Sequence, residues 1–226
     1  MEQASQEERD SSRSVVSPAV INRLPRYFRY LRKLIRMGKT RVSSAELSQM
    51  MNVTASQIRQ DLNCFGGFGQ QGYGYNVNYL YAKICEILGV DMGFRTAVIG
   101  AGNLGSALVR SPLFEKRGVD VVAMFDISKS IVGKKIGNVR VYHINDLEAR
   151  LKELSVDIVI LTMPKECTDD IVNRLLRTDV HGIWNFTGQE LEPSDIVVEN
   201  IHIGDSLMAL CYGVAQRMDK GKEKET

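Results

Sequence analysis

The strongest constraint on the fold is a glycine-rich turn that follows a short apolar run. Residues 96–99, Thr-Ala-Val-Ile, lead directly into Gly-Ala-Gly-Asn-Leu-Gly at 100–105. The pattern G-x-G-x-x-G between a strand and a helix is typical of the turn that binds the pyrophosphate of a dinucleotide. We expect Gly100 to form the tight turn, Gly102 to let the backbone approach the phosphates, and Gly105 to allow close packing of the helix on the strand. The N-terminus of that helix adds free amides and a positive dipole.

An acidic residue stands at the distance that this fold requires. Asp126 directly follows the next apolar run, at 119–125, and lies 21 positions after Gly105. A carboxylate about 20 residues after the glycines hydrogen-bonds the ribose 2′-hydroxyl of the dinucleotide, and its charge repels a 2′-phosphate. Asp126 therefore favours NAD(H) over NADP(H), although Lys129 is close enough in the sequence to weaken that preference.

Apolar and amphipathic segments alternate through the rest of this half of the chain. The expected strands are 96–101, 119–125, 139–143, 156–163, 182–187 and 195–203, and the expected helices are 103–110, 145–154 and 165–177. Such alternation is typical of a parallel sheet covered by helices. The sequence therefore predicts a Rossmann-type doubly wound sheet.

The front of the chain carries helix signals of a different kind. Ser17-Pro18 and Pro25 mark helix starts. From Tyr27 to Ile35 apolar residues recur at helical spacing, and Gly38 follows where the helix is expected to end. Basic side chains occupy the remaining faces of this expected helix.

Two shorter helices are expected next, separated by a tight turn at Asn52-Val53. Ser43 and Glu46 form one capping-box pattern, and Thr54 and Gln57 form a second. Two short capped helices behind a longer one are typical of a helix-turn-helix. The second short helix, 54–64, offers side chains of the kinds that contact DNA bases: Ser56, Gln57, Arg59, Gln60 and Asn63. Taken alone, these residues fit an ordinary polar helix surface better, because capped polar helices are common.

A glycine- and aromatic-rich stretch follows at 65–75, Phe-Gly-Gly-Phe-Gly-Gln-Gln-Gly-Tyr-Gly-Tyr. Glycines permit a tight hairpin and close backbone approach to a surface. We expect a wing with Gln70 and Gln71 at its tip, and an amphipathic helix at 77–88 that bridges to the second half. No Gly-Lys-Ser/Thr follows, so a Walker phosphate loop is excluded.

The charge distribution supports a polyanionic partner for the front of the chain. Residues 1–84 carry 12 Lys and Arg against 6 Asp and Glu, whereas residues 85–226 carry 17 against 21. The alternative is a solvated helix face. The four cysteines lie far apart, no apolar run reaches membrane-spanning length, and the polar N-terminus resembles no secretion signal. We therefore expect a cytoplasmic protein with no disulfide framework, no metal site and no membrane segment.

Catalytic groups are difficult to find. A dehydrogenase needs an acid or base beside the nicotinamide, and the only histidines are His143, His181 and His202. None has an obvious partner, and the chain has little room for a substrate domain. We therefore expect no catalytic residue and no enzyme, with an NAD-dependent oxidoreductase that carries a basic N-terminal appendage as the alternative.

Taken together, the motifs closely resemble the Rex family of redox-sensing transcriptional repressors. They are RLPRYFRYL (23–31), VSSAEL (42–47), QIRQDLNCFGGFGQQGYGY (57–75), GAGNLGSAL (100–108), FD (125–126), LTMP (161–164) and NF (185–186). The resemblance implies a homodimer that binds palindromic double-stranded operator DNA and is released by NADH, while NAD⁺ competes and permits DNA binding. It also implies a swapped C-terminal helix.

The resemblance extends the candidate sites and domains. Residues expected to bind NADH or NAD⁺ are Gly100, Ala101, Gly102, Asn103, Leu104, Gly105, Asp126, Thr162, Met163, Pro164, Asn185, Phe186 and Ile203. Residues expected to bind DNA are Arg26, Arg29, Ser43, Ser44, Ser56, Gln57, Arg59, Gln60, Asn63, Gln70, Gln71 and Tyr73. The expected domains are a disordered lead (1–16), a winged helix-turn-helix (17–84), a Rossmann domain (85–203), a dimer-crossing helix (204–218) and a disordered tail (219–226).

Three positions depart from the family pattern. Thr187-Gly188 follows the NF element, where relatives often have Ala-Pro or Thr-Pro. His202 replaces an acid that pairs with the arginine matching Arg29 in the family's switch, and Ile203 stands where relatives can have phenylalanine. The switch in this chain then either uses a different contact or depends on the protonation of His202. The alternative is that His202 is a tolerated surface substitution. A regulator that senses coenzyme A or another nucleotide is a further alternative.

Overall fold

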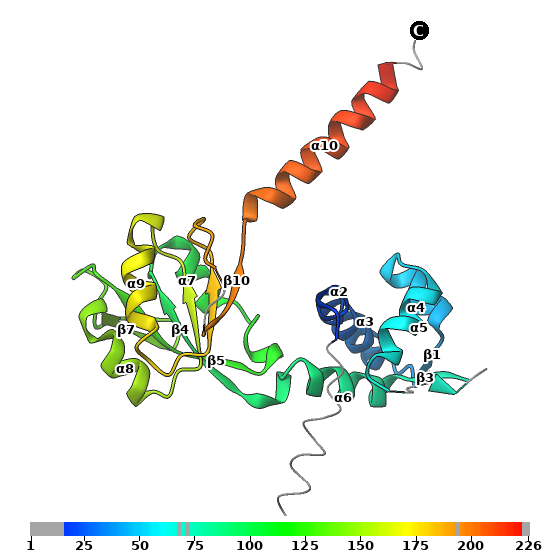
Figure 1. The fold of residues 1–226 in the computed structure, drawn as a ribbon, viewed down its shortest axis with the longest axis horizontal. Helices are drawn as coiled ribbons and strands as arrows, with labels where there is room; N and C mark the ends of the chain where they lie inside the picture. Colours follow the sequence, from blue (N-terminus) through cyan, green and yellow to red (C-terminus); the bar gives the residue numbers. More distant parts are fainter. Residues whose placement is uncertain (1–15, 67–68, 71–72, 193–194, 223–226) are drawn as a thin grey trace, which may run out of the picture. The chain divides into compact units, whose positions relative to one another are not determined.

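The structure is a computed structural model that describes residues 16–66, 69–70, 73–192 and 195–222. Its internal contacts divide the chain into two compact units, Met1–Asp91 and Met92–Thr226 (Figure 1). The expected lead at 1–16 falls outside the described residues, except for Val16. Each unit is described by itself.

The first unit combines helices with a small antiparallel sheet. Its helices are α2 (Pro18–Ile21), α3 (Leu24–Arg36), α4 (Ser44–Met51), α5 (Ala55–Asn63) and α6 (Val77–Ile87). Its strands are β1 (Arg41–Val42), β2 (Gly69–Gln70) and β3 (Gly74–Asn76), in the order β1-β3-β2. Because β2 and β3 pair as a hairpin directly after α5, the predicted winged helix-turn-helix is confirmed.

Local capping explains where the two short helices begin and end. The Ser43 hydroxyl accepts a hydrogen bond from the Glu46 amide (3.1 Å), and Glu46 accepts one from the Ser43 amide (2.9 Å). Asn52, with φ 51°, ends α4 in the left-handed conformation. At α5 the Thr54 hydroxyl accepts from the Gln57 amide, but the Gln57 side chain bonds Asp61. The second predicted capping box is therefore only half formed.

The core of the first unit extends further along the chain than expected. Tyr27, Leu31 and other apolar residues of α3 pack with buried residues of α6. Ile84 and Cys85 are both buried in this core. The expected domain boundary between residues 84 and 85 would cut α6, whereas the contacts place the division after Asp91.

The second unit contains a seven-stranded sheet in the order β10-β9-β8-β4-β5-β7-β6. Its strands are β4 (Phe94–Ile99), β5 (Val119–Asp126), β6 (Lys135–Ile136), β7 (Val139–His143), β8 (Ile158–Leu161), β9 (Gly182–Asn185) and β10 (Val197–Asn200). All pairs are parallel except that of β6 with β7. The crossover from β7 to β8 places the two ends of the order on opposite sides of β4, as the predicted Rossmann topology requires. The short strand β6 was not predicted.

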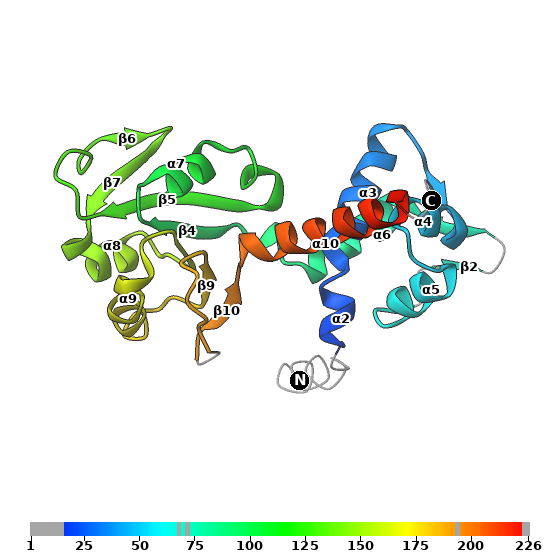
Figure 2. The ribbon, with the colours of Figure 1, turned by 90° about the horizontal axis from the view of Figure 1, so that it is seen from above.

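Helices cover the two faces of this sheet. Figure 2 shows α7 (Asn103–Arg110) on one side of β4 and β5, and α8 (Leu147–Glu153) and α9 (Thr168–Leu175) on the other. Two apolar cores, one on each face, are built around the central strands. Residues 165–167, predicted as the start of a helix, form a separate 3-10 turn before α9.

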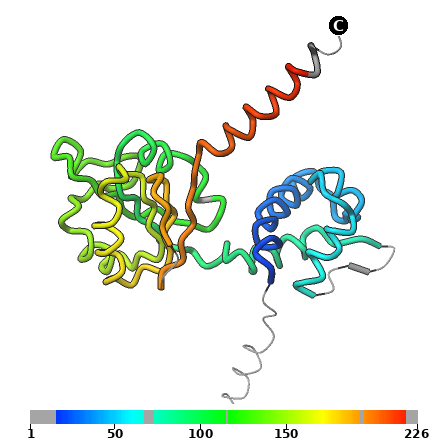
Figure 3. Tube along the Cα trace, turned by 45° about the horizontal axis from the view of Figure 1, so that its top comes forward, coloured from blue at the N-terminus to red at the C-terminus, as the bar shows by residue number. Residues whose placement is uncertain are grey.

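The C-terminal helix α10 (Ile203–Lys222) has no neighbour within its unit (Figure 3). It is longer at both ends than the expected helix 204–218, so the tail expectation is wrong for 219–222, while 223–226 lie outside the described residues. All side chains from 203 to 219 are exposed. No helix in the described part of the chain is long and apolar enough to cross a membrane.

Candidate functional site

Two of the three loop glycines are required by the protein's own packing. Gly100 has φ 98°, and a Cβ there would lie 2.9 Å from the Thr162 carbonyl. A Cβ on Gly105 would lie 2.1 Å from the Gly100 oxygen and 2.7 Å from the Thr162 hydroxyl. Both contacts are far closer than van der Waals packing allows. The expected roles of Gly100 in the turn and of Gly105 in helix packing therefore have a structural basis.

Gly102 is different, because packing among the described residues does not require it to lack a side chain. A Cβ there meets no atom within 4 Å, and its φ of −69° and ψ of −165° suit any residue. Gly102 is also the N-cap of α7 and supplies no side-chain cap. The N-terminus of α7 therefore has no side-chain cap and has open space at its N-cap residue, an arrangement that suits the binding of phosphate at a helix N-terminus.

Asp126 ends β5 beside this loop, as predicted. One carboxylate oxygen accepts a hydrogen bond from the Ala101 amide (2.7 Å), and the other accepts from the Ser128 amide (2.8 Å). Asp126 therefore braces the glycine loop. Each ionised oxygen has a further lone pair, so this brace is compatible with the expected contact to a ribose hydroxyl.

The segment after β8 lies against the same loop. The Thr162 hydroxyl donates a hydrogen bond to the Gly100 carbonyl (2.8 Å). Met163 is half-buried and packs against the core, whereas Pro164 is exposed. Because parallel strands end at a common edge, the structure brings residues 162–164 and Asp126 to the edge that carries the glycine loop.

Asn185, which was expected to contact the nucleotide, is held by hydrogen bonds to residues of its own unit. Its buried amide nitrogen donates to the Gln189 carbonyl (2.6 Å) and to Asn200 Oδ1 (2.8 Å), and its oxygen accepts from the backbone and hydroxyl of Thr187. All its side-chain donors are used, so in this structure Asn185 offers none to a nucleotide. Its neighbour Phe186 packs edge-on against Trp184, with ring centroids 4.7 Å apart.

The two unusual residues at the start of α10, His202 and Ile203, are exposed. His202 Nε2 lies 2.7 Å from Glu190 Oε2, so the partner of His202 is a residue of its own unit. Ile203 is the first residue of α10, with 61% of its surface exposed. Neither residue contacts the glycine loop through an interaction that the structure shows.

In the first unit, the polar face of α5 is formed as predicted. Ser56, Arg59, Gln60 and Asn63 are exposed, whereas Gln57 is half-buried. The Arg59 guanidinium donates to the Ser44 hydroxyl at the start of α4 (3.2 Å). The structure thus joins two expected DNA contacts from different helices.

Arg26 was expected at the DNA surface, but its guanidinium hydrogen-bonds the Met51 carbonyl at the C-terminal end of α4. It is half-buried and satisfies one of the carbonyls that a helix end leaves free. Ser43 is likewise occupied by its capping box. Arg29 remains exposed.

At the wing, Tyr73 pairs with Arg41, a residue that was not among the predicted DNA contacts. Tyr73 is 70% exposed. The Arg41 guanidinium lies 5.7 Å from the Tyr73 ring centroid and donates to the Tyr73 carbonyl (3.2 Å). Arg41 belongs to the basic run of the sequence, but the sequence alone does not show that Arg41 pairs with the wing. Only the backbone of Gln70 is described, and Gln71 lies outside the described residues.

Sequence reasoning also missed a buried carboxylate on α5. Asp61 accepts hydrogen bonds from Arg23 Nε and Nη2 (both 2.7 Å), from the Tyr27 hydroxyl (2.9 Å) and from Gln57 Nε2 (2.9 Å). Burial raises the pKa of Asp61, but the hydrogen bonds and the Arg23 charge outweigh it and hold the pKa below its ordinary value. Burial and the bond to Asp61 raise the pKa of Tyr27.

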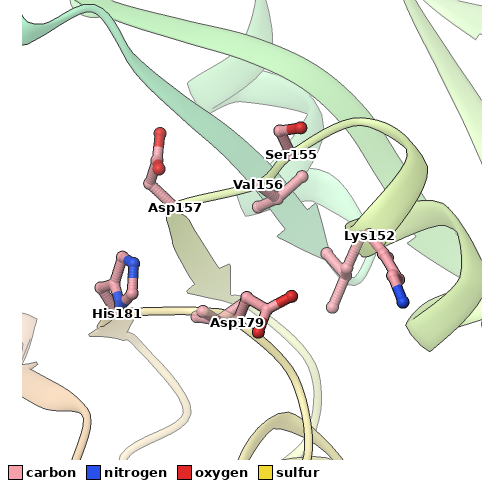
Figure 4. A pocket seen from close by; sticks show the side chains of 8 residues that line it. Lys152, Ser155, Val156, Asp157, Asp179 and His181 are labelled. Atoms are coloured by element: carbon pink, nitrogen blue, oxygen red, sulfur yellow. The ribbon is translucent and has the colours of Figure 1, made fainter.

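Other hollows lie elsewhere. One hollow of about 200 Å³ is lined by Asp157, Asp179, His181 and neighbouring residues, and Figure 4 shows their side chains. These residues precede β8 and β9, so this hollow is at the edge opposite the glycine loop. Within the described residues, no group of three or more His, Cys, Asp or Glu side chains could hold a metal ion.

Comparisons with known proteins cover both units of the chain. Residues 15–63 match the family described as "Putative DNA-binding protein N-terminus", and residues 93–188 match the family described as "CoA binding domain". The redox-sensing transcriptional repressor Rex of Caldicellulosiruptor saccharolyticus is 46% identical over 92% of this chain and 95% of its own. Rex of Thermoanaerobacter sp. is 48% identical over 89% of this chain and 91% of its own.

Solved structures give the same result. RSP in complex with β-NAD⁺ and operator DNA is 46% identical, with a TM-score of 0.85, and covers 94% of this chain and 99% of its own. RSP in complex with β-NADH is 43% identical, with a TM-score of 0.84, over 92% and 99%. RSP is described as a Rex-family repressor. With relatives this similar over nearly their whole length, the chain belongs to the Rex family of redox-sensing transcriptional repressors.

Proposed function

We propose that this chain represses transcription by binding operator DNA through its first unit, and that NADH bound at the glycine loop of the second unit releases the DNA. NAD⁺ competes for the loop and permits DNA binding. The observation that carries the nucleotide half is Gly102, where the protein leaves open space in front of the uncapped N-terminus of α7. RSP, a relative over nearly the whole chain, has been solved with β-NAD⁺ and with β-NADH.

Coenzyme A is the competing ligand, because residues 93–188 match a family named for it. Both ligands carry a pyrophosphate, so the glycine loop alone does not separate them. Calorimetric titration of the full chain with NADH, NAD⁺ and coenzyme A separates them directly. We expect NADH and NAD⁺ to bind and coenzyme A to bind at least tenfold more weakly. Tighter binding of coenzyme A than of NADH would overturn the assignment.

The DNA half of the proposal places α5 in the major groove, with Arg59 reading base edges and Ser44, Tyr73 and the exposed Arg29 near the backbone. The bond between Arg59 and Ser44 supports a shared surface. Arg59→Ala should weaken operator binding by about 1–3 kcal/mol and relax sequence preference. The control is Arg110→Ala, which removes an exposed arginine from α7. Unchanged affinity and selectivity in Arg59→Ala would show that α5 is not the reader.

We further propose that the protein is a homodimer joined through α10. Its exposed apolar residues Ile203, Leu207, Leu210, Val214 and Met218 recur every three or four positions, so they form one stripe along the helix. A stripe without a neighbour in its own unit requires a partner. A twofold dimer then presents two copies of α5 to a palindromic operator, with centres about 34–36 Å apart.

This proposal assigns the nucleotide a signalling role. NADH and NAD⁺ share the pyrophosphate, so the loop at 100–105 supplies affinity for both. Release of DNA requires that NADH bind one dimer conformation more tightly than the other. Discrimination therefore belongs to the nicotinamide end of the ligand. We expect the protein to act in the cytoplasm. We also expect its DNA-binding and nucleotide-binding domains to divide near Asp91, where the internal contacts divide the chain.

A further inference from the structure

The inference concerns how α5 reads DNA, and it rests on the proposed function. Asp61 is the only carboxylate in the described part of the chain that is fully buried. A buried charge is costly unless it is paired and hydrogen-bonded. Here each carboxylate oxygen accepts two hydrogen bonds, from Arg23 and Gln57 on one side and from Arg23 and Tyr27 on the other. The acceptor capacity of Asp61 is thus filled.

One of these bonds reaches the DNA-reading helix itself. Gln57 lies one turn before Asp61 on α5 and flanks the exposed face that carries Ser56 and Gln60. An ionised carboxylate can only accept hydrogen bonds. The amide of Gln57 must therefore turn its NH₂ end toward Asp61, at 2.9 Å. Its carbonyl end, Oε1, accepts no hydrogen bond from the described residues.

We propose that Asp61 is a positioning residue that fixes the Gln57 amide with its carbonyl oxygen presented to the DNA. Gln57 then reads a hydrogen-bond donor in the major groove. Only adenine, through its N6 amino group, and cytosine, through its N4 amino group, present such a donor there. Asp61 thereby helps to set base preference without touching DNA.

The Arg23 contact makes this orientation resistant to change. Arg23 lies at the junction of α2 and α3, and its guanidinium donates a hydrogen bond to each oxygen of Asp61. The carboxylate cannot rotate without breaking this forked pair. In Asp61→Asn, the amide that replaces the carboxylate has one acceptor and one donor end. Gln57 is then free to turn its oxygen toward Asn and its NH₂ toward the DNA.

The experiment is selection of bound duplexes from a random double-stranded library, followed by sequencing, with the full-length wild type and three variants. Gln57→Met removes the amide at similar length and identifies the base position that Gln57 reads. We expect the wild type to prefer adenine or cytosine there by roughly fivefold, the effect of one hydrogen bond. Asp61→Asn should reduce this preference below about twofold while the other positions keep theirs. Tyr27→Phe is the matched control, because it removes a bond to the other oxygen of Asp61 and should leave the sequence profile unchanged.

Every outcome of this experiment either supports or contradicts the positioning role of Asp61. Equal weakening at all positions in Asp61→Asn, or loss of the same preference in Tyr27→Phe, would show a merely structural role. A preference for guanine or thymine at the Gln57 position would contradict the carbonyl-out orientation. If Asp61→Asn does not fold, an unchanged profile in Gln57→Met still overturns the proposal, and a loss of the adenine or cytosine preference supports it. A wild type that selects no sequence would refute the proposed function itself.

Discussion

Separate substitutions of Gly102 and Gly105 should distinguish the glycine that ligand binding requires from the one that folding requires. In Gly105→Ala the new Cβ lies 2.1 Å from the Gly100 carbonyl oxygen, and that oxygen belongs to the backbone of the loop. Overpacking of this kind costs about 1–3 kcal/mol, while alanine regains up to about 1 kcal/mol of helix propensity. Because the oxygen in the way belongs to the backbone and not to a flexible side chain, the upper end of the overpacking range applies, and the net destabilisation is about 2 kcal/mol. In Gly102→Val the new Cβ meets nothing within 4 Å, so the main cost is the loss of a preferred N-cap residue, at most about 1 kcal/mol.

For NADH affinity the two substitutions should have the opposite order of effect, with Gly102→Val the more damaging. The valine at 102 fills the space in which the pyrophosphate must approach the backbone, so NADH affinity should fall at least tenfold, about 1.4 kcal/mol. Gly105 points toward β4 and Thr162, away from that space, and Gly105→Ala should retain measurable NADH binding in the folded fraction. Gly102→Val should also bind operator normally and fail to release it in NADH.

Two assays are sufficient. The chain has a single tryptophan, Trp184 on β9, so urea unfolding followed by its fluorescence reports on the second unit. Calorimetry then measures NADH binding to each folded variant. Wild-type NADH affinity in Gly102→Val would refute the assignment of the open space to the pyrophosphate. Full stability in Gly105→Ala would refute the packing argument.

Three further predictions concern charge, specificity and assembly. Asp126→Ala should narrow the preference for NADH over NADPH, measured by calorimetry, because it removes the charge that repels a 2′-phosphate; equal wild-type affinities for both would remove this role. The Arg174 hydrogen bond lowers the pKa of Glu148 to about 2 from 4.5, so this pair stabilises the fold above about pH 4.5 and less so as the pH falls toward 2. Discounted for the 44% exposure of Glu148, it contributes on the order of 1 kcal/mol, and the stability difference between wild type and Glu148→Gln should shrink over that range; a pH-independent difference would contradict the linkage. Leu210→Glu should convert the dimer to a monomer in sedimentation experiments, and a persistent dimer would place the interface elsewhere.

Local sequence patterns predicted the elements that local physics determines. The Ser43–Glu46 capping box, the helix break at Asn52 and the strand-turn-helix around Gly102 depend on residues a few positions apart. Asp126 was found because the fold fixes its distance from the glycines. These features led from the sequence to the correct family.

Long-range contacts were beyond the reach of such patterns. Nothing in the sequence singled out Asp61, because its partner Arg23 is 38 residues away along the chain. Arg26 caps a helix end 25 residues away. Asn185, predicted as a ligand contact, also hydrogen-bonds Asn200 from the adjacent strand. Pairings of this kind join residues that are far apart in the sequence or lie on different elements, so only the fold reveals them.

The most direct test of the central claim is titration of a labelled palindromic operator complex with NADH and, separately, with NAD⁺. The account predicts that saturating NADH weakens operator binding at least tenfold, about 1.4 kcal/mol, whereas NAD⁺ leaves it intact. Coupling is reciprocal, so saturating operator DNA should weaken NADH binding by the same factor. Equal operator affinity in saturating NADH and in NAD⁺ would contradict the claim that this chain couples its nucleotide site to DNA.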